Sequence, residues 1–141
     1  MKRFFVAFMA FWMLGCASQD TFTLWQLESQ VDTIGNSYVI RTAGGKLIVM
    51  DGGMAVEKDY LRGFIDALGG EVSAWIVSHP HDDHISALVA LLENPNGLKI
   101  EKIYHSRFTE ELIDSESEAE SAITRKFYSL LDNAKDIQVF D

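Results

Sequence analysis

The hydrophobic residues of this chain change their spacing along the sequence, and each spacing predicts a different kind of element. Short runs rich in β-branched and aromatic residues predict strands. These runs cover Phe22–Leu27, Ser37–Arg41, Lys46–Met50, Ala74–Ser78, Leu98–Tyr104 and Ile137–Phe140. Thr42-Ala43-Gly44-Gly45 joins the second run to the third and is typical of a hairpin turn.

Between these strands the spacing becomes helical. Lys58–Leu68 predicts a helix, and Gly69-Gly70 after it is typical of a helix end. One face of this helix would carry its apolar residues, which are Tyr60, Leu61, Phe64, Ile65 and Leu68. Ile85–Leu92 predicts a short apolar helix, and Glu110–Leu131 predicts helix in one or two pieces. Strands in a meander followed by alternating helices and strands predict a layered α/β fold.

Composition narrows the class of protein. The chain has 141 residues, of which 48% are hydrophobic, as expected for one globular domain. Its net charge of −9, from 21 acidic and 12 basic residues, argues against a nucleic-acid partner, because phosphate binding needs a basic surface. One acidic stretch has no obvious balancing base and predicts a solvated helix face. Its residues are Glu110, Glu111, Asp114, Glu116, Glu118 and Glu120.

The first residues predict a targeting signal. Lys2 and Arg3 precede an uncharged apolar stretch, residues 4–14, that is too short to span a bilayer comfortably. Cys16, the only cysteine, follows a small residue, and this segment resembles a bacterial lipoprotein signal. We therefore expect residues 1–15 to be a signal peptide, Cys16 to be lipidated, and residues 16–21 to form a tether. The protein would then be extracytoplasmic and held to a membrane by lipid; a secreted protein or a short membrane anchor are the alternatives.

The chemistry of the chain is concentrated in His79-Pro80-His81-Asp82-Asp83-His84. This segment holds three of the four histidines and follows an apolar strand. His79 and His81 alternate along the backbone, so their rings can converge on one ion. Asp83 and His84 lie where the next helix begins, which suggests a second metal position about 3.5–4 Å from the first. Imidazole and carboxylate ligands together suit zinc, manganese or iron.

At these residues the chain resembles a known family. His79-x-His81-x-Asp83-His84 is similar to the signature of the metallo-β-lactamase-fold hydrolase superfamily, and residues 78–88 are most similar to its competence-protein-like branch. Two upstream segments, Asn36–Ile40 and Ile48–Gly53, resemble strands that precede the signature in that family. The resemblance implies an αββα sandwich, of which residues 22–141 would form a partial domain, the first half.

The resemblance also implies roles for individual residues. His79 and His81 would bind a first metal, while Asp83 and His84 would bind a second. Asp83 would in addition act in catalysis by orienting a water molecule. Asp51 would support the site from its floor without binding metal, and Asp82 would be solvated. The implied cofactor is Zn²⁺ at two sites, with manganese or iron as alternatives, and the implied reaction is hydrolysis of an ester, amide, thioester or phosphodiester.

The family's remaining ligands come from the second half of its sandwich. His105 lies only 21 residues after His84, too soon to match the next of them, and we expect it to be a surface or loop histidine rather than a replacement ligand. A half-sandwich would expose a sheet face, which predicts a homodimer or association with the missing half. The alternatives to a hydrolase are a non-catalytic metal-binding or interaction lipoprotein and an inactive truncated remnant. The substrate stays open.

Overall fold

The computed structural model of this protein describes residues 21–141. The predicted signal segment, Cys16 and the tether up to residue 20 lie outside the described residues and stay predictions. Within residues 21–141, no helix combines the length and the hydrophobicity needed to cross a membrane.

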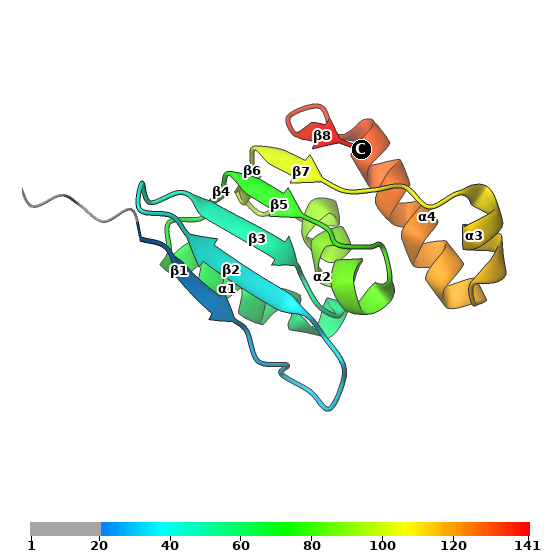
Figure 1. The fold of residues 1–141 in the computed structure, drawn as a ribbon, viewed down its shortest axis with the longest axis horizontal. Helices are drawn as coiled ribbons and strands as arrows, with labels where there is room; N and C mark the ends of the chain where they lie inside the picture. Colours follow the sequence, from blue (N-terminus) through cyan, green and yellow to red (C-terminus); the bar gives the residue numbers. More distant parts are fainter. Residues whose placement is uncertain (1–20) are drawn as a thin grey trace, which may run out of the picture.

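A six-stranded sheet forms the centre of the fold, with strand order β1-β2-β3-β5-β7-β8 (Figure 1). Its strands are β1 (Thr23–Gln26), β2 (Ser37–Arg41), β3 (Leu47–Asp51), β5 (Ala74–Ile76), β7 (Lys102–Tyr104) and β8 (Gln138–Phe140). β1, β2 and β3 pair antiparallel, whereas β3, β5, β7 and β8 run parallel. Parallel neighbours need crossover connections, so helices alternate with strands only after β3. Two short parallel strands, β4 (Glu71–Val72) and β6 (Lys99–Ile100), make a second sheet.

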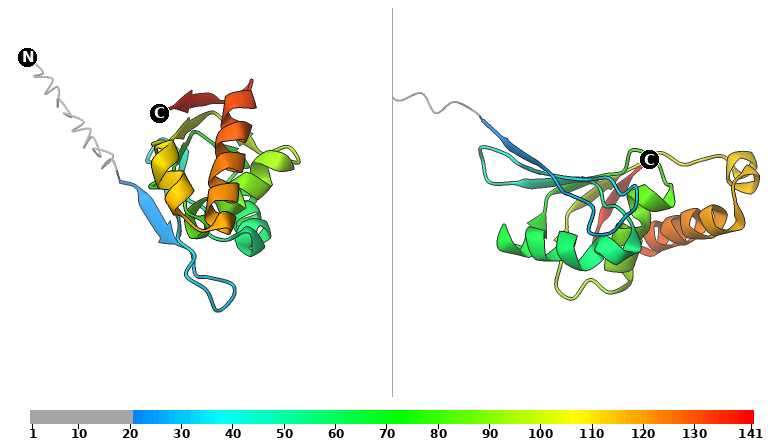
Figure 2. Two further views of the ribbon diagram at one scale, coloured as in Figure 1. Left: turned by 90° about the vertical axis from the view of Figure 1, so that its right-hand side faces the viewer. Right: turned by 90° about the horizontal axis from the view of Figure 1, so that it is seen from below.

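The helices follow β3 in the sequence. They are η1 (Ala55–Glu57), α1 (Lys58–Ala67), α2 (Asp82–Glu93), α3 (Glu110–Ser115) and α4 (Glu118–Asn133). Figure 2 shows α1, α2 and α4 below the sheet in its right-hand view. The layered α/β fold predicted from the sequence is therefore confirmed.

The hydrophobic core fills the space between these helices and the sheet. Trp75 in the middle of β5 is fully buried, and its register partners Val49 and Ile103 are also inaccessible to solvent. Ile65 of α1 and Phe127 of α4 are fully buried on the helix side. Because a buried tryptophan removes 150–250 Å² of surface from water, Trp75 is the largest anchor of this layer.

The other face of the sheet has no helix over it among the described residues. Strand register lines up one apolar row across this face: Tyr38, Met50, Ile76, Tyr104 and Phe140. The Tyr104 and Phe140 rings stack 4.7 Å apart, and both side chains are well exposed. The sheet face that the resemblance leads us to expect is thus present and apolar.

The structure refines the bounds of three predicted elements. α2 begins at Asp82 instead of Ile85, so its first turn includes part of the histidine motif. The run Leu98–Tyr104 is not one strand, because β6 pairs with β4 and β7 pairs with β5, and the chain changes sheets at Glu101. The helix predicted over Glu110–Leu131 is in two pieces, since the Ser117 side chain accepts a hydrogen bond from the Glu120 N–H and starts a new helix.

Candidate metal centre

The histidine motif leaves the sheet at the carboxyl end of β5. The Val77 N–H still donates to the Tyr104 carbonyl, which extends the pairing with β7 by one residue. The chain then passes through His79 and the buried Pro80 to His81, the residue before α2, whose carbonyl accepts from the His84 and Ile85 N–H groups. A strand end and a helix start therefore fix both sides of a short loop.

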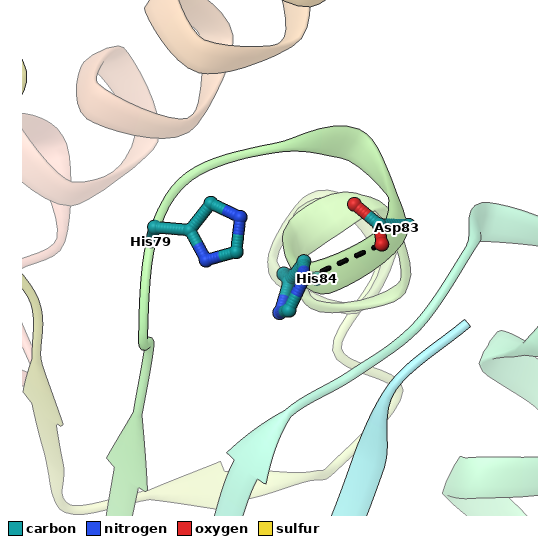
Figure 3. A group of neighbouring side chains, drawn as sticks. All are labelled: His79, Asp83 and His84. Atoms are coloured by element: carbon teal, nitrogen blue, oxygen red, sulfur yellow. Dashed lines mark ion pairs between the residues drawn. The ribbon is translucent and has the colours of Figure 1, made fainter. Parts of the chain in front are cut away.

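Three side chains of this loop and helix turn converge. Each of His79, Asp83 and His84 offers one ligand atom, and these atoms all lie within 4.8 Å of one another (Figure 3). Asp83 Oδ2 lies 3.3 Å from His84 Nε2. The His79 and His84 ring centroids are 3.9 Å apart. A carboxylate and two imidazoles in this arrangement are a chemically suitable donor set for zinc, manganese or iron, so the residues present fit a divalent metal.

His81 is near this cluster but faces elsewhere. Its ring centroid is 4.6 Å from that of His79. Its Nε2 lies 3.4 Å from Glu116 Oε1, at the junction of α3 and α4. The structure thus brings His79 together with Asp83 and His84, and the assignment of His79 and His81 to one metal and of Asp83 and His84 to a second stays a prediction.

Asp51 supports His84 from the end of β3. The Asp51 carboxylate is buried, and its Oδ2 lies 2.9 Å from His84 Nδ1. The Ser78 N–H donates to Oδ1 at 2.8 Å and the Ser78 hydroxyl donates to Oδ2 at 2.9 Å. A carboxylate beside Nδ1 favours the tautomer with its proton on Nδ1, which leaves Nε2 free to bind a metal. The φ of +56° at Asp51 is unusual for a residue other than glycine and is typical of a functional position.

The loop after Asp51 packs against the start of α2. The Gly53 carbonyl accepts a hydrogen bond from the Ala87 N–H. Gly53 has a φ of +81°, and a Cβ there would lie 2.2 Å from Glu57 Oε2, so a larger residue is excluded. Glu57 is buried and accepts hydrogen bonds from the Ser29 hydroxyl and from the N–H groups of Gln30 and Met54. No motif in the sequence indicated Glu57, whose partners are far apart along the chain.

The surroundings of His79 lower its pKa and so favour the neutral ring. Partial burial lowers the pKa of His79, and the neighbouring His84 and His81 rings lower it further, while the carboxylates of Asp51 and Asp83 act in the opposite direction. Because a metal binds only the neutral imidazole, a lowered pKa keeps His79 available as a ligand at neutral pH.

The acidic stretch near the site is largely solvated, as predicted, with four of its six residues exposed, but several of its carboxylates also make contacts. Glu110 and Asp114 both pair with Arg125, which is the balancing base. Glu116 approaches His81, and Glu120 accepts a hydrogen bond from the Asp82 N–H at 3.1 Å. Asp82 is half-buried. Arg125 lies eleven or more residues from its partners, so the contacts depend on how α3 and α4 pack.

His105 was predicted to be a surface or loop histidine; it lies in the loop that follows β7, but its side chain is buried, with 6% of the residue exposed. Its ring packs against Phe127 and Tyr128 of α4. Neither ring nitrogen has a hydrogen-bond partner within residues 21–141. Burial lowers the pKa of His105. The α4 helix covers this position, which the local sequence alone did not indicate.

Comparison with protein families and known proteins gave one family match. The model of the metallo-beta-lactamase superfamily matches residues 31–134. This range covers the motif, the strands on either side of it and all of α4. None of the curated proteins compared with this chain matches it.

Solved structures with the same family description are also similar. The metallo-beta-lactamase fold protein YhfI from Bacillus subtilis is 19% identical, with a TM-score of 0.48, over 71% of this chain and 43% of that one. A metallo-beta-lactamase with a HARLDQ motif from Cronobacter sakazakii is 19% identical, with a TM-score of 0.46, over 64% and 34%. BJP-1, a subclass B3 metallo-beta-lactamase of Bradyrhizobium japonicum, is 24% identical, with a TM-score of 0.37, over 49% and 25%. The matched part spans less than half of each of these structures.

Proposed function

The chain belongs to the metallo-beta-lactamase superfamily, and from this premise we propose that it carries part of the catalytic site of a metal-dependent hydrolase. A bound divalent metal would lower the pKa of a water ligand and polarise a substrate oxygen. The bond attacked would be an ester, amide, thioester or phosphodiester. The competence-protein-like branch remains the subgroup suggested by residues 78–88.

One observation carries this proposal: the convergence of His79, Asp83 and His84 at the end of a parallel strand. The Asp51 carboxylate beside His84 Nδ1 favours a proton on that nitrogen and so leaves Nε2 for a metal, while a lowered pKa favours the neutral ring of His79. Asp83, the catalytic candidate, would bind metal and accept a hydrogen bond from the attacking water. Zn²⁺ is the ion we expect first, with manganese or iron as alternatives.

The open sheet face bears on how the site would be completed. Its apolar row runs from Tyr38 across the sheet to Phe140, and burying such a face would stabilise association. We propose that this face packs either against a second copy of the chain or against further sequence of the same protein. Size-exclusion chromatography with light scattering distinguishes a dimer from a monomer, and Met50→Lys on this face should dissociate a dimer.

Membrane attachment through a lipid on Cys16 also remains a proposal, supported by the signal-like sequence before it. Metabolic labelling with an alkyne fatty acid should label the expressed full-length protein, and Cys16→Ser should abolish the label. Labelling of the serine variant would contradict lipidation at Cys16, and an unlabelled, released protein would favour secretion.

Metal content tests the central proposal directly. The purified full-length chain should contain at least about one metal ion, measured by plasma mass spectrometry after dialysis against zinc at defined free concentration. The double variant His79→Ala/His81→Ala should lose it, and Asp59→Asn on the exposed side of α1 serves as a matched control for purification and charge.

Hydrolysis of nitrophenyl esters, a chromogenic β-lactam and bis-nitrophenyl phosphate should then be measured on the same samples. Turnover that requires His81 and Asp83 would support the hydrolase. Metal without turnover would indicate a non-catalytic metal-binding protein instead, and metal no higher than in the double variant would rule out a working site in this chain.

A further inference from the structure

Glu116, in the acidic stretch, lies beside a histidine of the metal-binding motif. Its Oε1 lies 3.4 Å from His81 Nε2, although 35 residues separate the two along the chain. The side chains are only 33% exposed for His81 and 28% for Glu116. This contact therefore joins the histidine loop to a segment that the metal-binding motif does not include.

The position of Glu116 is set by the elements around it. It is the residue that follows α3, and Ser117 caps the start of α4 directly after it. The buried Thr124 hydroxyl donates to the Pro80 carbonyl at 2.8 Å, and Glu120 accepts from the Asp82 N–H. Two hydrogen bonds from α4 therefore hold the loop on both sides of His81. Glu116 therefore lies beside the His81 ring because of how α4 packs on the loop, and not because the two residues are close in the sequence.

The distance between the two atoms is informative. A hydrogen bond between a charged imidazole and a carboxylate is about 2.7–2.9 Å long. Two ligand atoms that bind one tetrahedral ion at about 2.0–2.1 Å lie about 3.3–3.4 Å apart. The His81–Glu116 separation of 3.4 Å matches the second value. So does the 3.3 Å between His84 Nε2 and Asp83 Oδ2, which both belong to the family's motif.

We propose that Glu116 is a metal ligand that joins His81 at a divalent-cation position next to the His79–Asp83–His84 cluster. The ring centroids of His79 and His81 are 4.6 Å apart, so the two positions would be adjacent. This inference rests on the proposed function, because it assumes that the motif binds metal. Glu116 would add a carboxylate beside His81, whereas the carboxylate of the motif, Asp83, lies with His79 and His84.

The test is a titration of the metal-free full-length protein with Zn²⁺ and, for spectroscopy, Co²⁺. Glu116→Gln keeps the shape of the side chain and removes its charge. It should weaken one of the bound ions at least about tenfold, by analogy with the loss of supporting residues at metal sites. The visible absorption of Co²⁺ should change as well, because it reports the ligands and their number. Glu118→Gln removes the same charge two residues away on an exposed position and should leave both readouts unchanged.

The outcomes separate this inference from the proposed function. If the unmodified protein binds no metal, both fail. If it binds metal and Glu116→Gln binds as tightly with the same Co²⁺ spectrum, Glu116 is not a ligand and the proposed function stands. Tighter binding by Glu116→Gln would also overturn the inference, because it would mean that Glu116 competes with the metal for His81. Circular dichroism of each variant checks that the fold is retained, as expected for a partly exposed side chain.

Discussion

The strands β5 and β7 are parallel neighbours, and each delivers a histidine at its carboxyl end, but the two histidines have opposite surroundings. His79 follows β5 and meets polar partners, since Asp83 and His84 offer ligand atoms within 4.8 Å. His105 follows β7 and meets the apolar faces of Phe127 and Tyr128. Similar residues at similar strand ends thus have different chemistry.

The difference shows that companions, rather than the histidine itself, make a metal site. Burial lowers the pKa of both residues and so favours the neutral ring in each. Of the two strand ends, the end of β5 is the one where imidazole and carboxylate atoms converge on the histidine ring. It is also the one where a buried carboxylate, that of Asp51, orients a second histidine, His84. Substitutions at the end of β5 or at the end of β7 test this difference.

The largest effect should follow from Asp51→Asn at the β5 side. The amide keeps the shape of the side chain but loses the charge that holds His84 Nδ1–H, so His84 becomes a poorer and less ordered ligand. We expect metal affinity to fall about 10–100-fold, the range for loss of a partner that orients a ligand histidine. Competition with a chromophoric chelator measures this.

The matched variant is Asp59→Asn, whose carboxylate is exposed on α1. It should bind metal like the unmodified chain. Full affinity in Asp51→Asn would mean that the Asp51–His84 contact is structural, and the contrast between the ends of β5 and β7 would then rest on the motif residues alone.

A smaller effect is expected from His105 at the end of β7, where acid should lower the free energy of unfolding. Burial lowers the pKa of His105 in the folded chain, whereas the ordinary value of about 6.5 applies when the chain unfolds. Below that pH the unfolded state binds a proton that the folded state resists. The free energy of unfolding is therefore unaffected by His105 above about pH 6.5 and falls as the pH drops below it, by at most about 1.4 kcal/mol per pH unit for one proton.

Urea unfolding with a metal chelator present, from pH 7.5 to pH 5, measures this dependence. His105→Gln should have a shallower slope than the unmodified chain, whatever its stability at neutral pH. Asp141 and Asp132 raise the pKa of His105 and Arg107 lowers it, but each of these effects is weaker than that of burial. Equal slopes for the two proteins would show that His105 does not resist protonation in the fold.

The sequence predicted the β5 side of this comparison better than the β7 side. Trp75 and its flanking apolar residues identified a buried strand, and the dense run His79–His84 identified its chemistry, because both signals are local. The burial of His105 depends on α4 packing against it, and the contact of Glu116 with His81 depends on the turn between α3 and α4. Residues 20 or more positions away make these environments, and no local pattern encodes them.

The smallest effect should come from Ser78→Ala, which affects the same carboxylate as Asp51→Asn but removes only one of its supports. The Ser78 hydroxyl donates to Asp51 Oδ2 and lies 3.2 Å from Nδ1 of both His79 and His84. The Ser78 backbone N–H still donates to Oδ1 in the variant, and the charge of Asp51 remains. Loss of one hydrogen bond predicts about 1 kcal/mol, or about a fivefold weaker metal affinity.

Ser73→Ala, just before β5, is the control, because Ser73 lies at the opposite end of the strand from the site. A loss in Ser78→Ala as large as that in Asp51→Asn would mean that the hydroxyl, through its contacts with both histidines, orders the ligands itself. A loss near fivefold would instead assign that ordering to the buried charge of Asp51. At the end of β7 the histidine ring packs against Phe127 and Tyr128, and no carboxylate within residues 21–141 forms a hydrogen bond with it.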